Sequence, residues 1–319
     1  MKLQVFSRYN GDNETRFGDC IMLYNDNELV IYDCGHDRHA EEVLNFLGGR
    51  GNKRNAKISI IVSHNDSDHT KGVNKLLTEL SKGWSDGSIY HQYNVTVYTS
   101  LYLKHARKVL SILDDGRRTL PATKEHILKY FDHIKEIVNL SEKLKFTIKD
   151  AVEETVIVAG ICKLVGPNED NFVTVVAKAI ENKGTGQING ETVKNAASVQ
   201  LACKLENENF ALLCGDASPS YLPDLSSYRI VQLPHHGNYD SALEVFEKIP
   251  AASISEYTFI ISDNTGNSKG GSDSLMANSS LKKGKVIRNT KNGNIIEIKA
   301  PIYASTQETS HSYGIWFGL

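Results

Sequence analysis

The sequence lacks any long run of apolar residues. None of its 319 residues belongs to a stretch approaching the roughly 18 consecutive apolar side chains of a transmembrane helix. The segment 1–5 also lacks the apolar core of a secretory signal peptide. We therefore expect a cytoplasmic protein without a membrane segment.

Cysteine is scarce, with only five residues in the chain. They are odd in number, far apart and mostly within apolar segments: Cys20, Cys34, Cys162, Cys203 and Cys214. Disulfide frameworks and structural zinc sites both use paired or closely spaced cysteines. The pattern excludes both and is typical of buried thiols in a reducing compartment.

A strong excess of charge of either sign is also absent. The 36 Lys and Arg nearly balance the 38 Asp and Glu, which leaves a formal net charge of −2. Long-range attraction to nucleic acid or to a membrane is therefore weak, and any site for a polyanion must be local. With 40% hydrophobic residues, no repeats and no clear linker, residues 1–319 are interpreted as a single globular domain.

The sequence does contain a dense group of potential metal ligands. Two histidines and two aspartates fall within six residues: His64, Asp66, Asp68 and His69. The apolar segment 58–62 before them predicts a strand, so the group lies in a loop at the strand's end. Imidazole together with carboxylate suits zinc, manganese or iron. The alternative, a polar loop that only caps the next helix, explains one of these residues but not both histidines.

Three more predicted strands end in polar loops that carry His or Asp. These are segment 210–214 before Asp216, segment 230–233 before His235 and His236, and segment 259–261 before Asp263. We expect the first two of these loops to meet the His64–His69 loop at one metal centre, because three separate strand ends deliver its ligands.

The rest of the chain predicts an α/β fold with mixed sheets. Further strands are expected at 3–6, 20–24, 29–32, 94–98, 156–158, 161–165 and 199–205. Helices are expected at 40–47 and after Gly72, and a loop at 182–195. Residues 101–145 predict two helices, broken at Pro121, that form an insertion. Between Lys104 and Lys129 seven Lys or Arg stand against three Asp or Glu, which indicates a solvated helix face or, alternatively, a platform for a phosphate backbone.

The order of these motifs resembles the metallo-β-lactamase superfamily. The resemblance rests on His-x-Asp-x-Asp-His at 64–69, Gly215-Asp216 and His235-His236-Gly237, each after a predicted strand. More narrowly, the chain resembles the hydrolase domain of ComEC-type competence proteins. That likeness adds Gly18-Asp19-Cys20, Asp33-Cys34-Gly35, Asn195 with Ser198, and Asn238 with Ser241.

The resemblance implies an αββα sandwich of the metallo-β-lactamase type, with a helical insertion at about 101–145. It implies one metal site formed by Asp68, His69, Asp216 and either His235 or His236, and a second formed by His64 and Asp66. The family's last ligand histidine stands directly before glycine, which favours His236. Asp216 matches a bridging carboxylate, Asp68 and His69 match catalytic positions, and Asp19 and Asp33 are expected to orient ligands or loops.

Two features depart from the family. Members with two metals carry another ligand histidine before the bridging aspartate, but this chain has none between His133 and His235. We therefore expect one tight site for Zn²⁺ or Mn²⁺ and a second that is weak or empty, or completed by Asn195 or water. The His-Pro pair of the competence proteins is also absent, and residues 268–273 stand in its place.

The resemblance implies a metal-dependent hydrolase, a phosphodiesterase or nuclease that acts on DNA or another phosphodiester through a metal-activated water. Four residues are candidates for substrate binding: Asn195, Ser198, Asn238 and Ser241. For Asn238, Ser241 and Lys269, loop and cap chemistry explains the residue types equally well. The alternatives are a small-molecule esterase or lactonase, and a non-catalytic regulatory protein that retains the fold. The aromatic residues Tyr313, Trp316 and Phe317 are expected to pack internally or, alternatively, to dock a protein partner.

Overall fold

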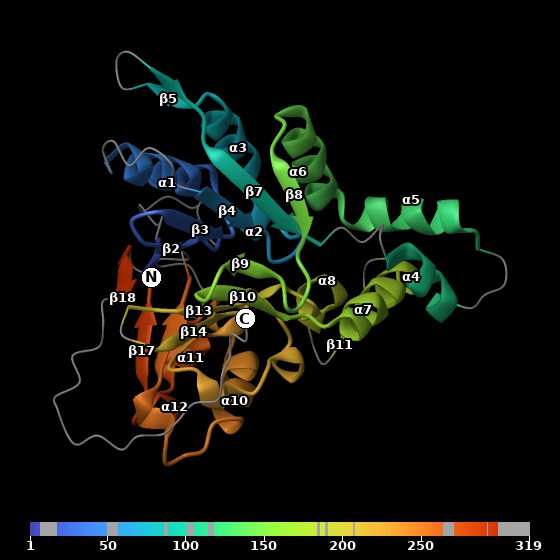
Figure 1. The fold of residues 1–319 in the computed structure, drawn as a ribbon. Coiled ribbons are helices and arrows are strands. Elements are labelled where there is room, and N and C mark those ends of the chain that lie inside the picture. The colour runs from blue at the N-terminus through green and yellow to red at the C-terminus, as the bar shows by residue number, and fades with distance from the viewer. Residues whose placement is uncertain are drawn as a thin grey trace.

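Two seven-stranded sheets form the centre of the protein in the computed structural model (Figure 1). The structure describes residues 1–6, 18–49, 57–85, 89–100, 105–113, 118–183, 186–188, 191–206, 208–263, 271–291 and 293–298. The predictions for Lys269 and for the aromatic residues after 310 lie outside these ranges. Within them, no helix has the length and apolar character needed to cross a membrane.

The first sheet has the strand order β18-β1-β2-β3-β4-β7-β8. Its strands are β1 (Lys2–Val5), β2 (Ile21–Tyr24), β3 (Glu28–Tyr32), β4 (Lys57–Ile61), β7 (Asn94–Thr99), β8 (Thr147–Asp150) and β18 (Ile296–Ile298). Pairing is antiparallel from β18 to β3 and parallel from β3 to β8. The parallel strands β3 and β4 therefore both end at the same edge of the sheet.

The second sheet has the order β17-β16-β15-β14-β13-β10-β9. Its strands are β9 (Val156–Val158), β10 (Cys162–Gly166), β13 (Gln200–Lys204), β14 (Phe210–Leu213), β15 (Ile230–Gln232), β16 (Thr258–Ile261) and β17 (Val286–Asn289). Strands β14 to β17 are parallel, while β9, β10, β13 and β14 pair antiparallel. The ends of β14, β15 and β16 thus lie beside one another.

Alternation of side chains along the strands divides the interior into three layers. In β4, Ile60 belongs to the outer cluster under the helices and Ile61 to the cluster between the sheets. In β13, Leu201 faces the cluster between the sheets and Ala202 faces the outer cluster on the other side. Successive residues of a strand point to opposite faces, so each sheet buries apolar side chains on both sides.

Helices cover both outer faces, which confirms the predicted αββα sandwich. The longer ones are α1 (Asp37–Gly49), α3 (Val73–Ser81), α4 (Ala106–Leu113), α5 (Leu120–Tyr130), α6 (Asp132–Lys143), α7 (Glu169–Glu181) and α10 (Tyr239–Glu247). Helices α1, α3 and α6 pack on the first sheet and α10 on the second. Shorter ones are α2 (Ser67–Thr70), α8 (Val193–Ala196), α9 (Pro234–Gly237), α11 (Asp273–Ala277) and α12 (Ser279–Lys282).

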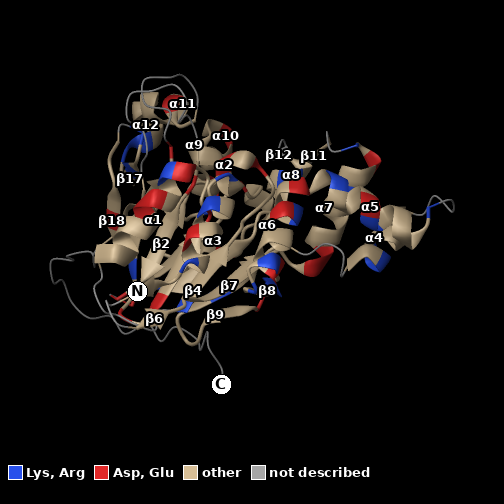
Figure 2. Ribbon diagram, turned by 90° about the horizontal axis from the view of Figure 1, so that it is seen from above, with Lys and Arg blue, Asp and Glu red and all other residues tan. Residues whose placement is uncertain are grey.

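The insertion contains three helices, α4, α5 and α6, rather than the two predicted. Pro121 does not break a helix. It lies in the first turn of α5, where its missing N–H has no intrahelical partner to lose, and Thr119 caps that turn by accepting from the Ala122 N–H at 3.4 Å. The second break falls at Phe131, which joins α5 to α6. Lys, Arg, Asp and Glu are interspersed over these helices in Figure 2, and Lys108 pairs with Glu169 at 2.7 Å, which favours a solvated face.

The predicted loop at 182–195 was wrong in part. It contains a short hairpin of β11 (Gln187–Ile188) and β12 (Glu191–Thr192), followed by the start of α8. Thr192 caps α8 by accepting from the Asn195 N–H at 3.3 Å. This polar segment therefore carries Asn195 toward the strand ends on an ordered turn.

Candidate metal centre

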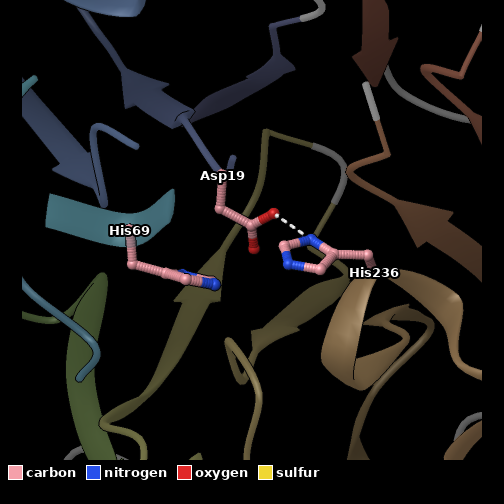
Figure 3. A group of neighbouring side chains, drawn as sticks. All are labelled: Asp19, His69 and His236. Carbon is pink, nitrogen blue, oxygen red and sulfur yellow. Dashed lines mark ion pairs between the residues drawn. The ribbon is translucent and has the colours of Figure 1, made fainter. Parts of the chain in front are cut away.

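The three histidines of the site come from two loops, one on each sheet. His64 lies in the loop after β4 of the first sheet and His69 lies in α2, while His236 lies in α9 directly after β15 of the second sheet. Asp216 follows β14, the strand beside β15. Figure 3 shows His69 and His236 pointing toward each other across the space between the two loops.

Asp216 is the carboxylate that all three imidazoles face. Its Oδ1 lies 3.3 Å from His69 Nε2, and its Oδ2 lies 3.9 Å from His64 Nε2 and 4.0 Å from His236 Nε2. Asp216 and the three histidines are buried. The centre therefore presents three Nε2 atoms around one buried carboxylate.

The other ring nitrogen of His69 is held by Asp33, which lies at the end of β3. Asp33 Oδ2 is 2.8 Å from His69 Nδ1, and this carboxylate also accepts from the Ser63 N–H at 2.7 Å and the Ser63 hydroxyl at 2.6 Å. Because Ser63 donates its only hydroxyl proton to Asp33, its oxygen can accept from His64 Nδ1 at 3.0 Å. In their neutral form, both rings are thus held with a proton on Nδ1 and a lone pair on Nε2.

His236 is oriented by β16 and by the start of β2. Its Nδ1 donates to the Ser262 carbonyl at 3.0 Å, which directs Nε2 toward Asp68 Oδ2, also at 3.0 Å. Asp19 Oδ1 lies 3.3 Å from the same Nδ1, as the dashed line in Figure 3 shows. The sharp turn that aims this ring uses left-handed backbone at His235 and His236, with φ of 54° and 53°. Non-glycine residues adopt this region rarely, so the turn holds an uncommon conformation at the centre.

Burial and neighbouring charges shift the pKa values of Asp216 and His69 in opposite directions. Burial alone would raise the pKa of the Asp216 carboxyl, but the imidazoles of His69 and His236 outweigh it and hold that pKa well below its usual range. Burial would lower the pKa of His69, whereas Asp216 and Asp33 raise it well above the ordinary value. Burial dominates at His64 and, with the charge of His69, lowers its pKa. A cation at the centre would be attracted by the same carboxylates.

The potential ligand atoms of these histidines and aspartates fit a divalent metal. Four of them are buried without a hydrogen-bond partner among the described residues, namely His64 Nε2, His69 Nε2, Asp216 Oδ1 and Asp19 Oδ1. Buried polar atoms are normally paired, so a cluster of such atoms indicates a missing partner. In two groups all ligand atoms lie within 4.8 Å of one another: His64 with His69 and Asp216, and Asp19 with His69 and His236. A mixed imidazole and carboxylate set suits Zn²⁺ or Mn²⁺.

The aspartates of the motif lie at the open side of the centre. Asp68, with 31% of its side chain exposed, contacts His236. Asp66, with 37% exposed, lies 3.9 Å from His64 Nε2. The structure therefore brings His64, Asp66, Asp68, His69, Asp216 and His236 to one place.

His235 is less buried than His236, and it is His236 that lies beside Asp68 and Asp216. The structure therefore favours His236 as the ligand.

Asp19 is a residue for which the resemblance implied only an orienting role. Its second oxygen accepts from Gln232 Nε2, and Gly18-Asp19 was the signal that could have placed it at the centre. Since Asp19 faces Nδ1 of His236 rather than Nε2, it is positioned to orient that ring.

The four predicted substrate-binding residues have internal partners. Asn195 is buried and donates through Nδ2 to Asp216 Oδ2 at 3.4 Å, so it supports the central carboxylate. Ser198 is fully buried and donates to the Asn195 carbonyl at 2.8 Å, so the predicted contact of its hydroxyl with substrate is not favoured. Asn238 caps α10 by accepting from the Asp240 and Ser241 N–H groups, and the Ser241 hydroxyl donates to it. The capping interpretation therefore fits Asn238 and Ser241.

Comparison with known proteins bears on the fold. No family model matches the sequence, and no curated protein matches it. Among solved structures, the chain is similar to the metallo-β-lactamase fold protein YhfI from Bacillus subtilis, at 11% identity and a TM-score of 0.52, over 93% of this chain and 100% of that one. A metallo-β-lactamase from Pontibacter korlensis matches at 13% identity and a TM-score of 0.32, over 67% of each chain. The similarity to the first protein, over nearly the whole chain, shows the metallo-β-lactamase fold.

Proposed function

We propose that this chain of metallo-β-lactamase fold is a metal-dependent hydrolase, and that its substrates are phosphodiesters. The observation that supports the first part is the buried set of Nε2 atoms around Asp216, with Nδ1 of each ring held from behind. Such backing by carboxylate, hydroxyl or carbonyl groups fixes the tautomer that a metal-binding imidazole needs.

Six residues would hold metal: Asp68, His69, Asp216 and His236 at a tighter site, and His64 and Asp66 at a weaker one. A bound divalent ion would supply a hydroxide at neutral pH, by lowering the pKa of its water toward about 7, and would polarise the bond under attack. Asp68 lies at the exposed edge and contacts His236, so its carboxylate is positioned to orient a water that enters from solvent. Asn195 would hold Asp216 in place through its 3.4 Å hydrogen bond.

The choice of a phosphodiester rests on the narrower resemblance to ComEC-type competence proteins. The residues that carry it include Asp19 at the start of β2 and Asp33 at the end of β3, and both lie against ligand histidines in the structure. DNA is the first substrate to test.

The test is a metal-dependent panel of single-stranded DNA, duplex DNA, RNA, a cyclic nucleotide, a simple lactone and a thioester, each with Mn²⁺ and with Zn²⁺. We expect cleavage of at least one phosphodiester that requires metal and is lost in Asp68→Ala. The exposed Asp170→Ala in α7 is the matched control. If only the lactone or the thioester is opened, the proposed hydrolase activity stands and the proposed phosphodiester substrate is refuted. Failure to retain metal after purification without chelator, together with no activity, would favour a non-catalytic protein.

A further inference from the structure

A buried amide side chain, that of Gln232, lies at the end of β15, shortly before His236 in the chain. The two other residues of this strand are apolar: Ile230 belongs to the cluster between the sheets and Val231 to the outer cluster. Because side chains alternate along a strand, Gln232 faces the first sheet. Only 2% of it is exposed. A buried amide is unfavourable unless hydrogen bonds satisfy it, so its partners indicate what it does.

The oxygen of this amide holds the loop that carries Asp216. Gln232 Oε1 accepts from the backbone N–H groups of Cys214 at 3.0 Å and Gly215 at 3.2 Å, the two residues directly before Asp216. The other side of this loop approaches Ser63 so closely that a Cβ on Gly215 would lie 2.9 Å from Ser63 Oγ. The position of Asp216 therefore depends on the contact of its loop with Gln232.

The nitrogen of the same amide holds Asp19, which precedes β2 of the first sheet. Gln232 Nε2 donates to Asp19 Oδ2, and Asp19 Oδ1 lies 3.3 Å from His236 Nδ1. The backbone N–H of Asp19 donates to the Asp68 carbonyl at 3.0 Å. Asp19 thus connects Gln232 both to the ring of His236 and to the turn that carries Asp68 and His69.

The ligands of the proposed metal centre come from both sheets, Asp68 and His69 from the first and Asp216 and His236 from the second. A metal site works only if its ligands are held within about 0.5 Å of the required geometry. Gln232 contacts both halves through one planar group. The chemistry of this contact requires an amide, because a carboxylate has no donor, an ammonium has no acceptor and an apolar side chain has neither.

We propose that Gln232 is a positioning residue of the metal centre, which sets the spacing between the ligands of the two sheets. The inference rests on the proposed function, since it assumes that the centre holds a metal. Gln232 does not bind the metal in this proposal. It acts through the loop of Asp216 and through the carboxylate of Asp19.

An exchange of amide and carboxylate tests the pair. In Asp19→Asn the new side chain has one acceptor for two donors, Gln232 Nε2 and His236 Nδ1. Adding Gln232→Glu restores a partner for each group: the Asn NH₂ donates to one Glu oxygen, the Asn oxygen faces His236, and the second Glu oxygen accepts the two backbone N–H groups. The double variant also has the net charge of wild type.

The affinities for Zn²⁺ and for Mn²⁺ are measured by competition with a chromophoric chelator, on protein whose folding is verified by circular dichroism. We expect Asp19→Asn to bind metal roughly 10- to 100-fold more weakly than wild type, the usual cost of losing support behind a ligand. The double variant should regain most of the lost affinity. Gln232→Glu alone should bind no more tightly than wild type, because its carboxylate faces that of Asp19.

Two controls separate positioning from other effects. Gln92→Glu, exposed just before β7, makes the same chemical change on the surface and should leave metal affinity unchanged. The free energy of unfolding of each metal-free variant is measured by urea titration, because a purely structural role would change this quantity and leave the metal affinity of the folded protein unchanged.

The comparison of Asp19→Asn with the double variant decides the proposal even if Gln232→Glu alone does not fold. A double variant that binds no more tightly than Asp19→Asn overturns it, as does an Asp19→Asn that binds like wild type. Tighter binding by Gln232→Glu than by wild type would show that only charge matters, and would also overturn it. If wild type itself binds neither ion, the proposed function fails and this inference fails with it, whereas in the other cases wild type still binds metal.

Discussion

Replacing Asp33 by Asn tests how the centre controls its ligands. Asp33 is fully buried and accepts three hydrogen bonds, two from Ser63 and one from His69 Nδ1. An Asn side chain has one acceptor and one NH₂ group in place of two acceptors. If its oxygen keeps the Ser63 N–H, its NH₂ faces both the Ser63 hydroxyl and His69 Nδ1.

The variant should therefore change the tautomer of His69. With a donor opposite, Nδ1 becomes the acceptor and the proton moves to Nε2, the atom that faces Asp216. Loss of such a backing partner lowers metal affinity about 10- to 100-fold, which corresponds to about 1.4–2.8 kcal/mol. The backbone itself should tolerate the change, because Asp33 has φ 60° and Asn adopts left-handed conformations more readily than most residues.

Metal affinity is measured by competition with a chromophoric chelator. The tautomer of His69 is measured by nitrogen NMR of the metal-free protein at a pH above the raised pKa of this ring, where the ring is neutral. Asp170→Asn, on the surface of α7, is the matched control, and circular dichroism verifies that Asp33→Asn is folded. A folded Asp33→Asn that binds metal as tightly as wild type, with the His69 proton still on Nδ1, would refute the reasoning.

Three further predictions follow from the same geometry. Removing metal with a chelator should lower the unfolding temperature, because a ligand at 100 times its Kd stabilises the folded state by about 2.7 kcal/mol; no change in a calorimetric scan would contradict a metal bound in the folded state. Metal titration followed by calorimetry should show one tight site, with Asp68, His69 and His236, and a weaker one with His64 and Asp66; two equal affinities would contradict this asymmetry. Asn238→Ala should lower the free energy of unfolding by about 1 kcal/mol through loss of the α10 cap, measured by urea titration, and leave KM unchanged; a raised KM at unchanged stability would instead favour a substrate contact.

Helix α7 was not predicted, although its sequence carries a helical pattern. One face of the helix is buried: Phe172, Val173, Val175, Val176, Ala177, Ala179 and Ile180. The polar residues Asn171, Thr174, Lys178 and Glu181 recur at spacings of three and four on the other face, which is the 3.6-residue pattern of an amphipathic helix. Strand β17 was missed because its four residues are only half-buried or exposed and the apolar signal is short.

The ligand loop could be predicted from the sequence because its residues are neighbours in the chain. His64, Asp66, Asp68 and His69 follow the apolar strand β4 directly, and local order alone places them at that strand's end. The same holds for the hairpin of β2 and β3, whose strands are separated by a short polar turn. A group of metal ligands that are neighbours in the chain can therefore be predicted from the sequence alone.

The resemblance implied that Asp19 and Asp33 orient ligands or loops, but only the tertiary structure decided which ring each of them holds. Asp19 accepts a hydrogen bond from Gln232, 213 residues further along the chain, and Asp33 reaches His69 across two adjacent parallel strands. Asn65 gave no signal of its own, although it joins the metal loop to α6. These contacts form where two sheets and an insertion pack together, and residue types at fixed spacing carry no information about distances between such distant segments.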